Sequence, residues 1–442
     1  MAGTRLTETM GTPTLGTKFT YSFWVKRSGL GAAETIASMW VDASNHIVLR
    51  FDAQDNLSFY ANVSGSYPLE LETNAVFRDT AAWYHIVAKV DTTQGTASDR
   101  CKLYVNGVEQ TSLAASTYPS QDATFSPNAS GTTHYIGGRG DGSYWNGLMS
   151  YAMFTDGSAY DASSFGSTDA TTGEWKITTG PSLTYGNNGF FILKDGNSVT
   201  DQSGNSNNFT VSDGTLTQTE DNPSNNFATL NNLIKNNASF DYGNLKLTTT
   251  VGTKDNAAST IGVSQGKWYA EAKLIAQSAA RFVLGVSPDP QDLEINNNFV
   301  GYQTDSVAYA SDGEVYKNTS SQYTGSTYTT NDIVGIALDL DNNNVYFHKN
   351  GTYQNSGDPT SGATGTGAVS LTSPSSLTTG FYFIAMGDTS NVHNITGEIN
   401  FGNGYFGTTA ISSEGTNASG YGKFEYDVPT GYTALCTKGL NE

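Results

Sequence analysis

Apolar and polar residues alternate along much of this chain, and the pattern is clearest in residues 333–354. Every second position from Val334 to Leu340 is apolar, as expected for a strand with one buried face. Residues 341–344 (Asp-Asn-Asn-Asn) permit a turn, and residues 345–348 run back. Asn350-Gly351 then supports a second tight turn, because both residue types tolerate positive φ. The segment predicts a β-hairpin followed by a further reversal.

A second hairpin of the same plan is predicted at residues 83–90 and 101–107, ending in Asn106-Gly107. Short alternating or apolar runs elsewhere predict more strands, and no segment shows the 3.6-residue period of a helix. The runs lie at residues 19–26, 35–40, 46–51, 57–63, 135–138, 145–154, 190–193, 266–272, 281–286, 381–385, 398–406 and 429–435. We therefore expect an all-β protein made of two antiparallel β-sandwiches in tandem.

The predicted strands fall into two groups, and the stretch between them suggests a domain boundary. Residues 213–231 are rich in Thr, Asn and Asp and contain Pro223, which favours a linker. We expect an N-terminal arm or a first edge strand at residues 1–17, a first sandwich at 18–212, a linker at 213–231 and a second sandwich at 232–442.

Composition narrows the classes of partner. The 442 residues carry a net charge of −19, only 14% are charged, and the Lys and Arg residues are scattered, so a nucleic-acid groove is not expected. No secretory signal is visible at the start, and no apolar run is long enough to insert into a membrane, so we expect synthesis in a cytoplasm. Cys101 alternates with Leu103 and Val105 and is expected to be a buried free thiol rather than a disulfide partner of Cys436.

Sequence motifs add a resemblance to two domain families. The order FWV, WYHIV, LYVNGV, YIGG and WNGLMSYAMF within residues 18–156 resembles the laminin-G-like or concanavalin A-like lectin/glucanase sandwich, a jelly-roll fold. The DQSGNSNNF turn at 201–209 resembles the turn that opens such domains, so here it is expected to pair back onto the first sandwich. WYAE, GIALD…VYFHKNG, NFG and a late P-x-G…L motif within residues 259–440 resemble a SPRY domain.

The pairing of these two domains through the NPSNNFATLN segment resembles virion proteins of marine tailed bacteriophages. That resemblance implies a structural protein of the virion, acting as a tail fibre, a spike or a capsid-decorating fibre. Its implied partners are other virion proteins and host-surface polysaccharides or other glycans. Because repetition strengthens a weak glycan contact, we expect a homo-oligomer, with a trimer favoured.

Two short motifs match known functional motifs, but each is better explained by its place in a strand or a turn. Glu70-Leu71-Glu72 places two carboxylates on one face of a strand, as in glycan hydrolases. The pair follows Pro68 and lacks a third acidic residue in register, so a solvated strand end is the preferred interpretation. Arg139-Gly140-Asp141 matches a tripeptide that integrins bind, but its Gly and Asp also suit a turn, which we prefer.

The sequence also contains candidate ligands for metal ions and for glycans. The five histidines share no zinc-ligand spacing, so no metal site is predicted, whereas structural Ca²⁺ stays open in the oxygen-rich loops 201–207 and 341–344. Aromatic loop residues near Asn and Asp can stack on sugars, although Tyr can equally fill a β-rich core. The candidate glycan-binding residues are Asp141, Tyr144, Trp145, Tyr302, Tyr309 and Tyr316, with Tyr323 and Tyr328 as further candidates.

Together these observations predict a non-enzymatic adhesin with no cofactor and no catalytic residue. Two alternatives stay open. One is a tailspike-like glycan hydrolase, which requires paired acidic residues that face one groove. The other is a purely architectural protein whose sandwiches contact other proteins of the particle.

Overall fold

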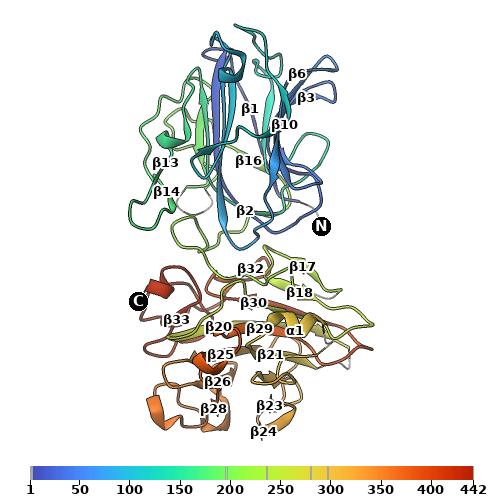
Figure 1. Cartoon of the computed structure of the whole chain (residues 1–442), viewed down its shortest axis with the longest axis vertical. Coiled ribbons are helices and arrows are strands. Elements are labelled where there is room, and N and C mark those ends of the chain that lie inside the picture. The colour runs from blue at the N-terminus through green and yellow to red at the C-terminus, as the bar shows by residue number, and fades with distance from the viewer. Residues whose placement is uncertain are drawn as a thin grey trace. The chain divides into compact units, whose positions relative to one another are not determined.

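The computed structural model describes residues 3–194, 196, 198–234, 237–278, 281–295 and 298–441, and it is almost entirely β (Figure 1). The chain divides into two compact units, Met1–Gln218 and Thr219–Glu442. The predicted all-β class is confirmed. Within the described ranges the one α-helix is α1 (Pro290–Ile295), which the alternation pattern does not reveal because a single turn is too short to show periodicity.

The N-terminal unit contains two facing sheets, here named A and B, in which all neighbouring strands are antiparallel (Figure 1). Sheet A has the order β10 (Leu113–Thr117), β6 (Ser66–Val76), β5 (Asn56–Val63), β4 (Asn45–Phe51), β3 (Glu34–Asp42), β11 (Thr133–Ile136), β1 (Arg5–Thr9) and β16 (Thr210–Asp213). Sheet B has the order β15 (Phe190–Ile192), β12 (Gly147–Asp156), β2 (Lys18–Arg27), β7 (Trp83–Asp91), β8 (Cys101–Val105) and β9 (Val108–Glu109). A small ribbon joins β13 (Gly166–Thr168) to β14 (Trp175–Ile177).

Of the two alternatives for residues 1–17, an arm or a first edge strand, the structure shows a strand. Residues 5–9 form β1, which lies inside sheet A between β11 and β16. The strand is held there because Leu6 pairs with Ile136 and is buried in the core. One apolar residue among four polar ones gives too little alternation for the sequence to reveal this strand.

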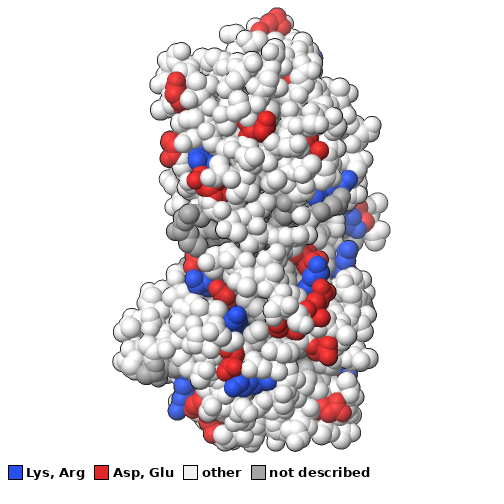
Figure 2. All heavy atoms as spheres, turned by 180° about the vertical axis from the view of Figure 1, so that it is seen from behind, with Lys and Arg blue, Asp and Glu red and all other residues white. Residues whose placement is uncertain are grey.

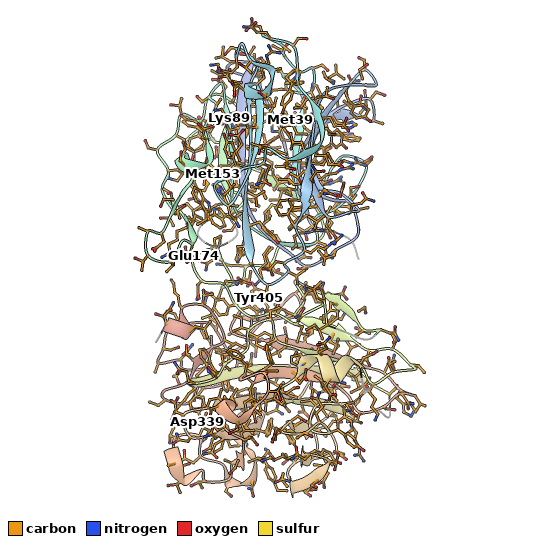
Figure 3. The ribbon with its side chains drawn as sticks, in the orientation of Figure 1. Met39, Lys89, Met153, Glu174, Asp339 and Tyr405 are labelled. Atoms are coloured by element: carbon orange, nitrogen blue, oxygen red, sulfur yellow. The ribbon has the colours of Figure 1, made fainter. Side chains whose placement is uncertain are left out.

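The core of the N-terminal unit lies between sheets A and B. Met39 of sheet A belongs to this layer, whereas Met153 of sheet B points to the other side, where residues 159–189 cover it (Figure 3). Successive residues of a strand point to opposite faces, so the sequence of β12 supplies both layers. Cys101 is a buried free thiol of the inner core, as predicted.

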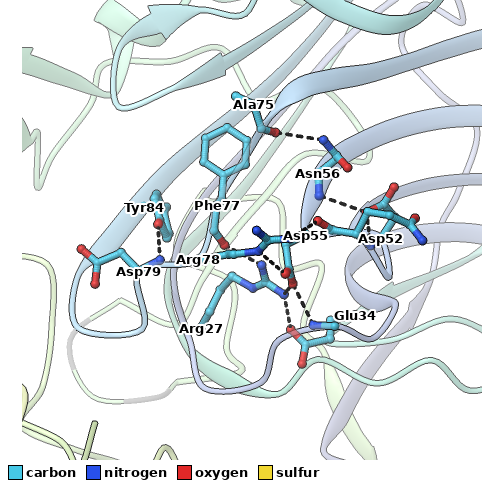
Figure 4. Close-up of polar contacts among 12 residues, drawn as sticks. Arg27, Glu34, Asp52, Asp55, Asn56, Ala75, Phe77, Arg78, Asp79 and Tyr84 are labelled. Atoms are coloured by element: carbon cyan, nitrogen blue, oxygen red, sulfur yellow. Dashed lines mark hydrogen bonds and ion pairs between the residues drawn. The ribbon is translucent and has the colours of Figure 1, made fainter. Parts of the chain in front are cut away.

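A buried ion cluster closes one end of this core (Figure 4). The guanidinium of Arg27 has no exposed surface and reaches Asp55 at 3.0 Å and Glu34 at 3.3 Å. It also donates to the carbonyl of Phe77 at 2.6 Å, while Arg78 binds Asp55 from the other side at 2.8 Å. Because several partners surround Arg27, its desolvation is compensated and the loops that meet here are tied together.

The C-terminal unit is also a pair of sheets, named C and D, and its neighbouring strands are antiparallel except for one short parallel pair. Sheet C has the order β17 (Ser239–Asp241), β18 (Lys246–Thr248), β30 (Ile395–Asn400), β20 (Lys267–Gln277), β25 (Ile333–Asp339), β26 (Asn344–Lys349) and β27 (Thr352–Tyr353), with β28 (Val369–Ser370) on β26 and β33 (Thr433–Ala434) parallel to β20. Sheet D has the order β19 (Asn256–Ala258), β29 (Phe383–Asp388), β21 (Phe282–Ser287), β22 (Val307–Ala310), β23 (Glu314–Lys317) and β24 (Ser320–Thr324). β31 (Tyr405–Phe406) and β32 (Thr409–Ala410) form a separate ribbon.

The predicted hairpin at the centre of this unit is confirmed. β25 and β26 pair from Val334↔Lys349 to Asp339↔Asn344, and Val334, Ile336 and Leu338 of β25 are fully buried in the core between sheets C and D. Asn343 and Asn350 have positive φ, 54° and 47°, which agrees with the turns expected from these residue types.

The predicted linker, residues 213–231, is divided between the two units. Asp213 ends β16, whereas Phe227 and Leu230 are buried in the core of the C-terminal unit. Phe227 forms a β-bridge with Cys436, so this part of the chain pairs with the last residues of its own unit. The stretch was predicted to be a linker because most of its residues are polar, although its few apolar residues anchor it in the core.

The surface seen in Figure 2 is mostly uncharged, and its acidic and basic groups are interspersed. This agrees with the charged content of 14%. Within the described part of the chain, no helix is long and apolar enough to cross a membrane.

Candidate functional site

The outward face of sheet A carries a set of aromatic and charged side chains. Leu49, Phe59 and Leu71 point inward and are fully or almost fully buried. Their neighbours point outward, and the register places Arg50 beside Ser58 and Glu72 in one row, and Val48 beside Tyr60 and Glu70 in the next. We call this surface the outer face of sheet A.

Four rings form a continuous aromatic row on the outer face. Trp40 stacks on His46, with ring centroids 4.6 Å apart and planes inclined by 12°. His46 meets Tyr60 edge-on at 5.7 Å, and Tyr60 lies 5.9 Å from Tyr67. Tyr67 is 48% exposed and Trp40 is partly exposed, so the two ends of the row are open to solvent. Exposed rings held by their neighbours are suited to stacking on a flat apolar ligand surface.

The turn that contains Arg139-Gly140-Asp141 lies on the same face. Ser38 donates a hydrogen bond to the carbonyl of Gly138 at 3.0 Å, which fixes the turn to β3. Arg139 lies 5.4 Å from the Trp40 ring and donates to the Tyr60 hydroxyl at 3.2 Å. Its guanidinium also binds Asp141 through two bonds of 2.7 and 3.0 Å.

This geometry bears out the prediction of a turn. Mutual backbone hydrogen bonds between Arg139 and Gly142 close it. Because Arg139 is held by Asp141, Trp40 and Tyr60, its guanidinium is not presented as a free arm for a receptor. The arginine instead rigidifies the aromatic row.

Glu70 and Glu72 flank the aromatic row in the middle of β6. This corrects the prediction of a solvated strand end: both side chains are half-buried, and their strand pairs with β5 and β10 on its two sides. Burial raises the pKa of Glu72, and the charges of Asp52 and Glu70 raise it further, while Arg50 acts against them. Arg50 itself lies 5.1 Å from the Tyr60 ring. Hydrogen-bond acceptors therefore lie beside the rings.

The predicted glycan-binding residues of the N-terminal unit separate in the structure. Asp141 and Tyr144 lie on or next to the outer face, and Tyr144 lies 5.6 Å from the Arg5 guanidinium. Trp145 does not. Only 8% of it is exposed, its ring lies 6.1 Å from Phe51 in the core, and its indole donates to the carbonyl of Leu148. A side chain in that position cannot stack on a sugar.

The candidates in the C-terminal unit separate in the same way. Tyr309 is fully buried on β22, where its ring lies 4.9 Å from Tyr328, so it cannot contact a glycan. Tyr302 is 45% exposed and lies 5.1 Å from Phe299. Tyr316 contacts the same Phe299 ring edge-on at 6.3 Å. Tyr302 and Tyr316 thus belong to one aromatic cluster. The further candidates Tyr323 and Tyr328 are half-buried and fully buried, respectively.

The structure also joins a serine and a histidine that the sequence did not connect. Ser22 Oγ lies 2.9 Å from Nε2 of His85, and the indole of Trp175 donates to Nδ1 of that ring at 3.0 Å. An acceptor at Nδ1 places the proton on Nε2, so His85 donates to Ser22 and cannot accept its proton as a general base does. Burial lowers the His85 pKa to about 3, and the ring has no exposed surface. The pair is structural.

A second buried histidine forms a similar chain in the C-terminal unit. Gly351 N–H donates to Nδ1 of His348, so Nε2–H donates to the Tyr269 hydroxyl at 2.7 Å. Tyr269 then donates to Glu271 at 2.9 Å. Glu271 also accepts the backbone N–H groups of Glu425 and Tyr426. Burial is the largest effect on this carboxyl and raises its pKa to about 7.

The oxygen-rich loops considered for Ca²⁺ are held by hydrogen bonds of their own. Asp201 accepts from the backbone N–H groups of Phe191, Ser203 and Asn207 and from the Ser203 hydroxyl. In the other loop, Asp339 and Asp341 accept backbone N–H groups. Across the described residues, no three His, Cys, Asp or Glu side chains are grouped closely enough to hold a metal ion.

Two protein-family models match the sequence. Residues 4–159 match the model described as the concanavalin A-like lectin/glucanases superfamily (Laminin_G_3), and residues 267–379 match the SPRY domain. The chain carries a concanavalin A-like domain and a SPRY domain in tandem. Both resemblances inferred from the sequence motifs are thereby confirmed, and the outer face of sheet A belongs to the concanavalin A-like domain. No curated protein matches the sequence.

Solved structures show similarity to the two domains separately. The SPRY domain of human HERC1 is 18% identical, with a TM-score of 0.30, over 38% of this chain and 96% of that chain. A heptameric SAP-like pentraxin from Limulus polyphemus is 16% identical, with a TM-score of 0.27, over 35% and 70%. Domain 4 of AbnA, a GH43 extracellular arabinanase from Geobacillus stearothermophilus, is 19% identical, with a TM-score of 0.26, over 33% and 64%. Similarity at this level carries no argument about function.

Proposed function

We propose that this chain is a non-enzymatic structural protein of a bacteriophage virion that adheres to host-surface glycans through the outer face of sheet A. The phage origin rests on the sequence resemblance to virion proteins of tailed phages. The observation that carries the adhesion is the aromatic row, with Tyr67 exposed at one end and Trp40 partly exposed at the other. In this role the chain is a tail fibre, a spike or a capsid-decorating fibre.

The chemistry of the outer face suits a neutral sugar polymer. Trp40 and Tyr67 offer ring faces for the apolar side of a pyranose, and Glu70, Glu72 and Asp141 offer acceptors for hydroxyl groups. Arg139 is held by Asp141, and Arg50 stands in the same row as Glu72, so the carboxylates of the face balance its arginines and it is not suited to a phosphate backbone. A single shallow face binds weakly, and repetition on a homo-oligomer, with a trimer favoured, supplies avidity.

The proposal is tested by removing the ring faces. Trp40→Ala and Tyr67→Ala are measured for retention of the purified chain on an array of bacterial surface polysaccharides. Each lost stacking contact is expected to cost about 0.5–1.5 kcal/mol beyond the lost contact area, and avidity multiplies this loss. Tyr242→Ala, which removes an exposed ring from the C-terminal unit, is the matched control. Equal retention of all three variants, with unchanged melting temperatures, contradicts adhesion through the outer face.

A glycan hydrolase is the second candidate, and one observation favours it. Glu70 and Glu72 lie on one face of β6, and burial, followed by the charges of Asp52 and Glu70, raises the pKa of Glu72, as is expected of the acid in a carboxylate pair. The test incubates each bound polysaccharide with the wild type and with Glu72→Gln, and measures new reducing ends. Release by the wild type that is lost in the variant establishes the enzyme. No release from a polysaccharide that is bound supports the adhesin. Failure of both functions leaves a purely architectural protein of the particle.

A further inference from the structure

A polar cavity opens in the C-terminal unit, and none of the candidate glycan-binding residues lines it, although Tyr302 adjoins it in sequence. Its volume is about 270 Å³. Three loops form it: the segment from β21 into α1, the turn before β22 and the segment before β29. The lining residues are Pro288, Asp289, Asp292, Gln303, Thr304, Asp305, Ser376, Leu377, Thr378 and Thr379.

The lining combines three carboxylates with no described cationic side chain, since none of the residues that form it is Lys, Arg or His. The walls are fixed in place. Gln303 is buried and donates to Asp292 at 2.6 Å and to the carbonyl of Asp289 at 3.0 Å, while its own oxygen accepts from Ser287. A cavity whose walls are held in this way is preformed.

The carboxylates keep acceptor capacity for a ligand. Oδ1 of Asp289 accepts hydrogen bonds from two backbone N–H groups. Oδ1 of Asp305 accepts one from the Thr372 hydroxyl. An acceptor-rich cavity of negative charge favours a ligand that brings N–H donors and a positive charge. Within the described chain, no three acidic groups are close enough together to hold a metal ion.

We propose that this cavity binds an ammonium or guanidinium group carried on a short aliphatic chain. A volume near the lower end for small-molecule pockets suits one lysine or arginine side chain, or a small free amine, rather than an oligosaccharide. The SPRY domain would then anchor a basic side chain of a partner protein, a role independent of the glycan face on the other domain.

Exposed rings next to the cavity in sequence support a cationic ligand. Tyr302 precedes Gln303 and is 45% exposed, and Phe381 follows two residues after Thr379 and is 44% exposed. The Lys254 ammonium lies 5.4 Å from the Tyr302 ring, so a cationic ligand would have to displace it there, whereas no such contact is found for Phe381 among the described residues.

Binding is tested on the full chain by saturation-transfer NMR titration with four probes. These are the N-acetyl, N-methylamide derivatives of lysine, arginine and norleucine, and putrescine. The lysine or arginine probe is expected to bind, more weakly at high salt, and norleucine, which lacks the charge, is not. Tighter binding of an amino-acid probe than of putrescine assigns the site to a protein side chain, and the reverse assigns it to a free amine.

Asp305→Asn and Asp289→Asn probe the cavity with little risk to folding. Asn tolerates the φ of +61° at position 305 and caps a helix as well as Asp does. Each change is expected to weaken binding of the basic probe about tenfold, the size of one charged hydrogen bond. Asp358→Asn removes the same charge from an exposed position outside the cavity and should leave binding unchanged.

Three results overturn the proposal: norleucine binds as well as lysine, the two cavity variants match Asp358→Asn, or only Ca²⁺ binds and the cavity variants abolish it. Glycan retention measured on the same variants separates this proposal from the adhesin. If a cavity variant no longer binds the basic probe but is still retained on glycans, the two sites are independent and the adhesin proposal is unaffected.

Discussion

Glu271 allows the electrostatics inside the SPRY domain to be measured directly. Its carboxyl is fully buried and accepts two backbone N–H groups and the Tyr269 hydroxyl, which favour the anion. Desolvation outweighs these bonds and raises the pKa from 4.5 to about 7. The folded domain therefore holds a proton at pH values where the unfolded chain has already released it.

The sign and size of the effect follow from this difference. Between about pH 4.5 and 7 the folded state binds more protons than the unfolded state, so the free energy of unfolding falls as pH rises. The difference of about 2.5 pKa units, at about 1.4 kcal/mol per unit, corresponds to a loss of about 3–4 kcal/mol across this window. Above pH 7 the contribution is constant.

Hydrogen exchange of peptides that cover β20 and β25 measures this free energy between pH 5 and 8. Asp388 of the same unit, whose pKa burial also raises to about 7, adds a second proton to the slope. In Glu271→Gln the slope should fall by about one proton, although overall stability also falls because an amide cannot replace both carboxylate acceptors. Asp388→Asn is the matched control and should remove the other proton. An unchanged slope in Glu271→Gln refutes the reasoning.

Three further outcomes follow from buried contacts. Arg27→Met should lower the free energy of unfolding of the N-terminal unit by about 3–5 kcal/mol in urea titrations, because Glu34 stays buried without its partner; adding Glu34→Gln should restore part of it. Gly335→Ala should lower the melting temperature of the SPRY domain, since a Cβ there would lie 1.9 Å from Nε2 of His348, and an unchanged value would show that this histidine moves freely. Both cysteines are buried, and burial raises the pKa of each thiol, so a thiol reagent should label them only after unfolding; rapid labelling of the native chain would contradict this.

Alternation predicted the strands well where one face is strongly apolar. The hairpin of β25 and β26 was predicted from its own residues, because both of its strands and its turns are local. For β1 the sequence left an arm and an edge strand open, because the place of this strand in sheet A depends on residues 133–136 and 210–213, far along the chain. Local patterns do not contain such pairings.

The outer face of sheet A was missed for the same reason. Trp40, Tyr60 and Glu72 each stand on a different strand, and only the strand order brings them together. The sequence did contain one usable signal, since each is the polar or aromatic partner of a buried neighbour. Trp145 and Tyr309 were included among the glycan-binding candidates as aromatic residues near loops, whereas the fold buries both rings, and burial depends on contacts that are not local in the sequence.

The pairing of the first and last segments of each unit has a consequence for synthesis on the ribosome. β1 can pair with β16 only after about two hundred further residues have been synthesised, and Phe227 can pair with Cys436 only at the end of synthesis. Neither unit can complete its sheets until its own final segment has left the exit tunnel, and contacts so distant in sequence form slowly. We expect nascent chains that end before residue 210 to expose the edge of β1 that β16 later covers, and chaperones to be needed most at that point of translation.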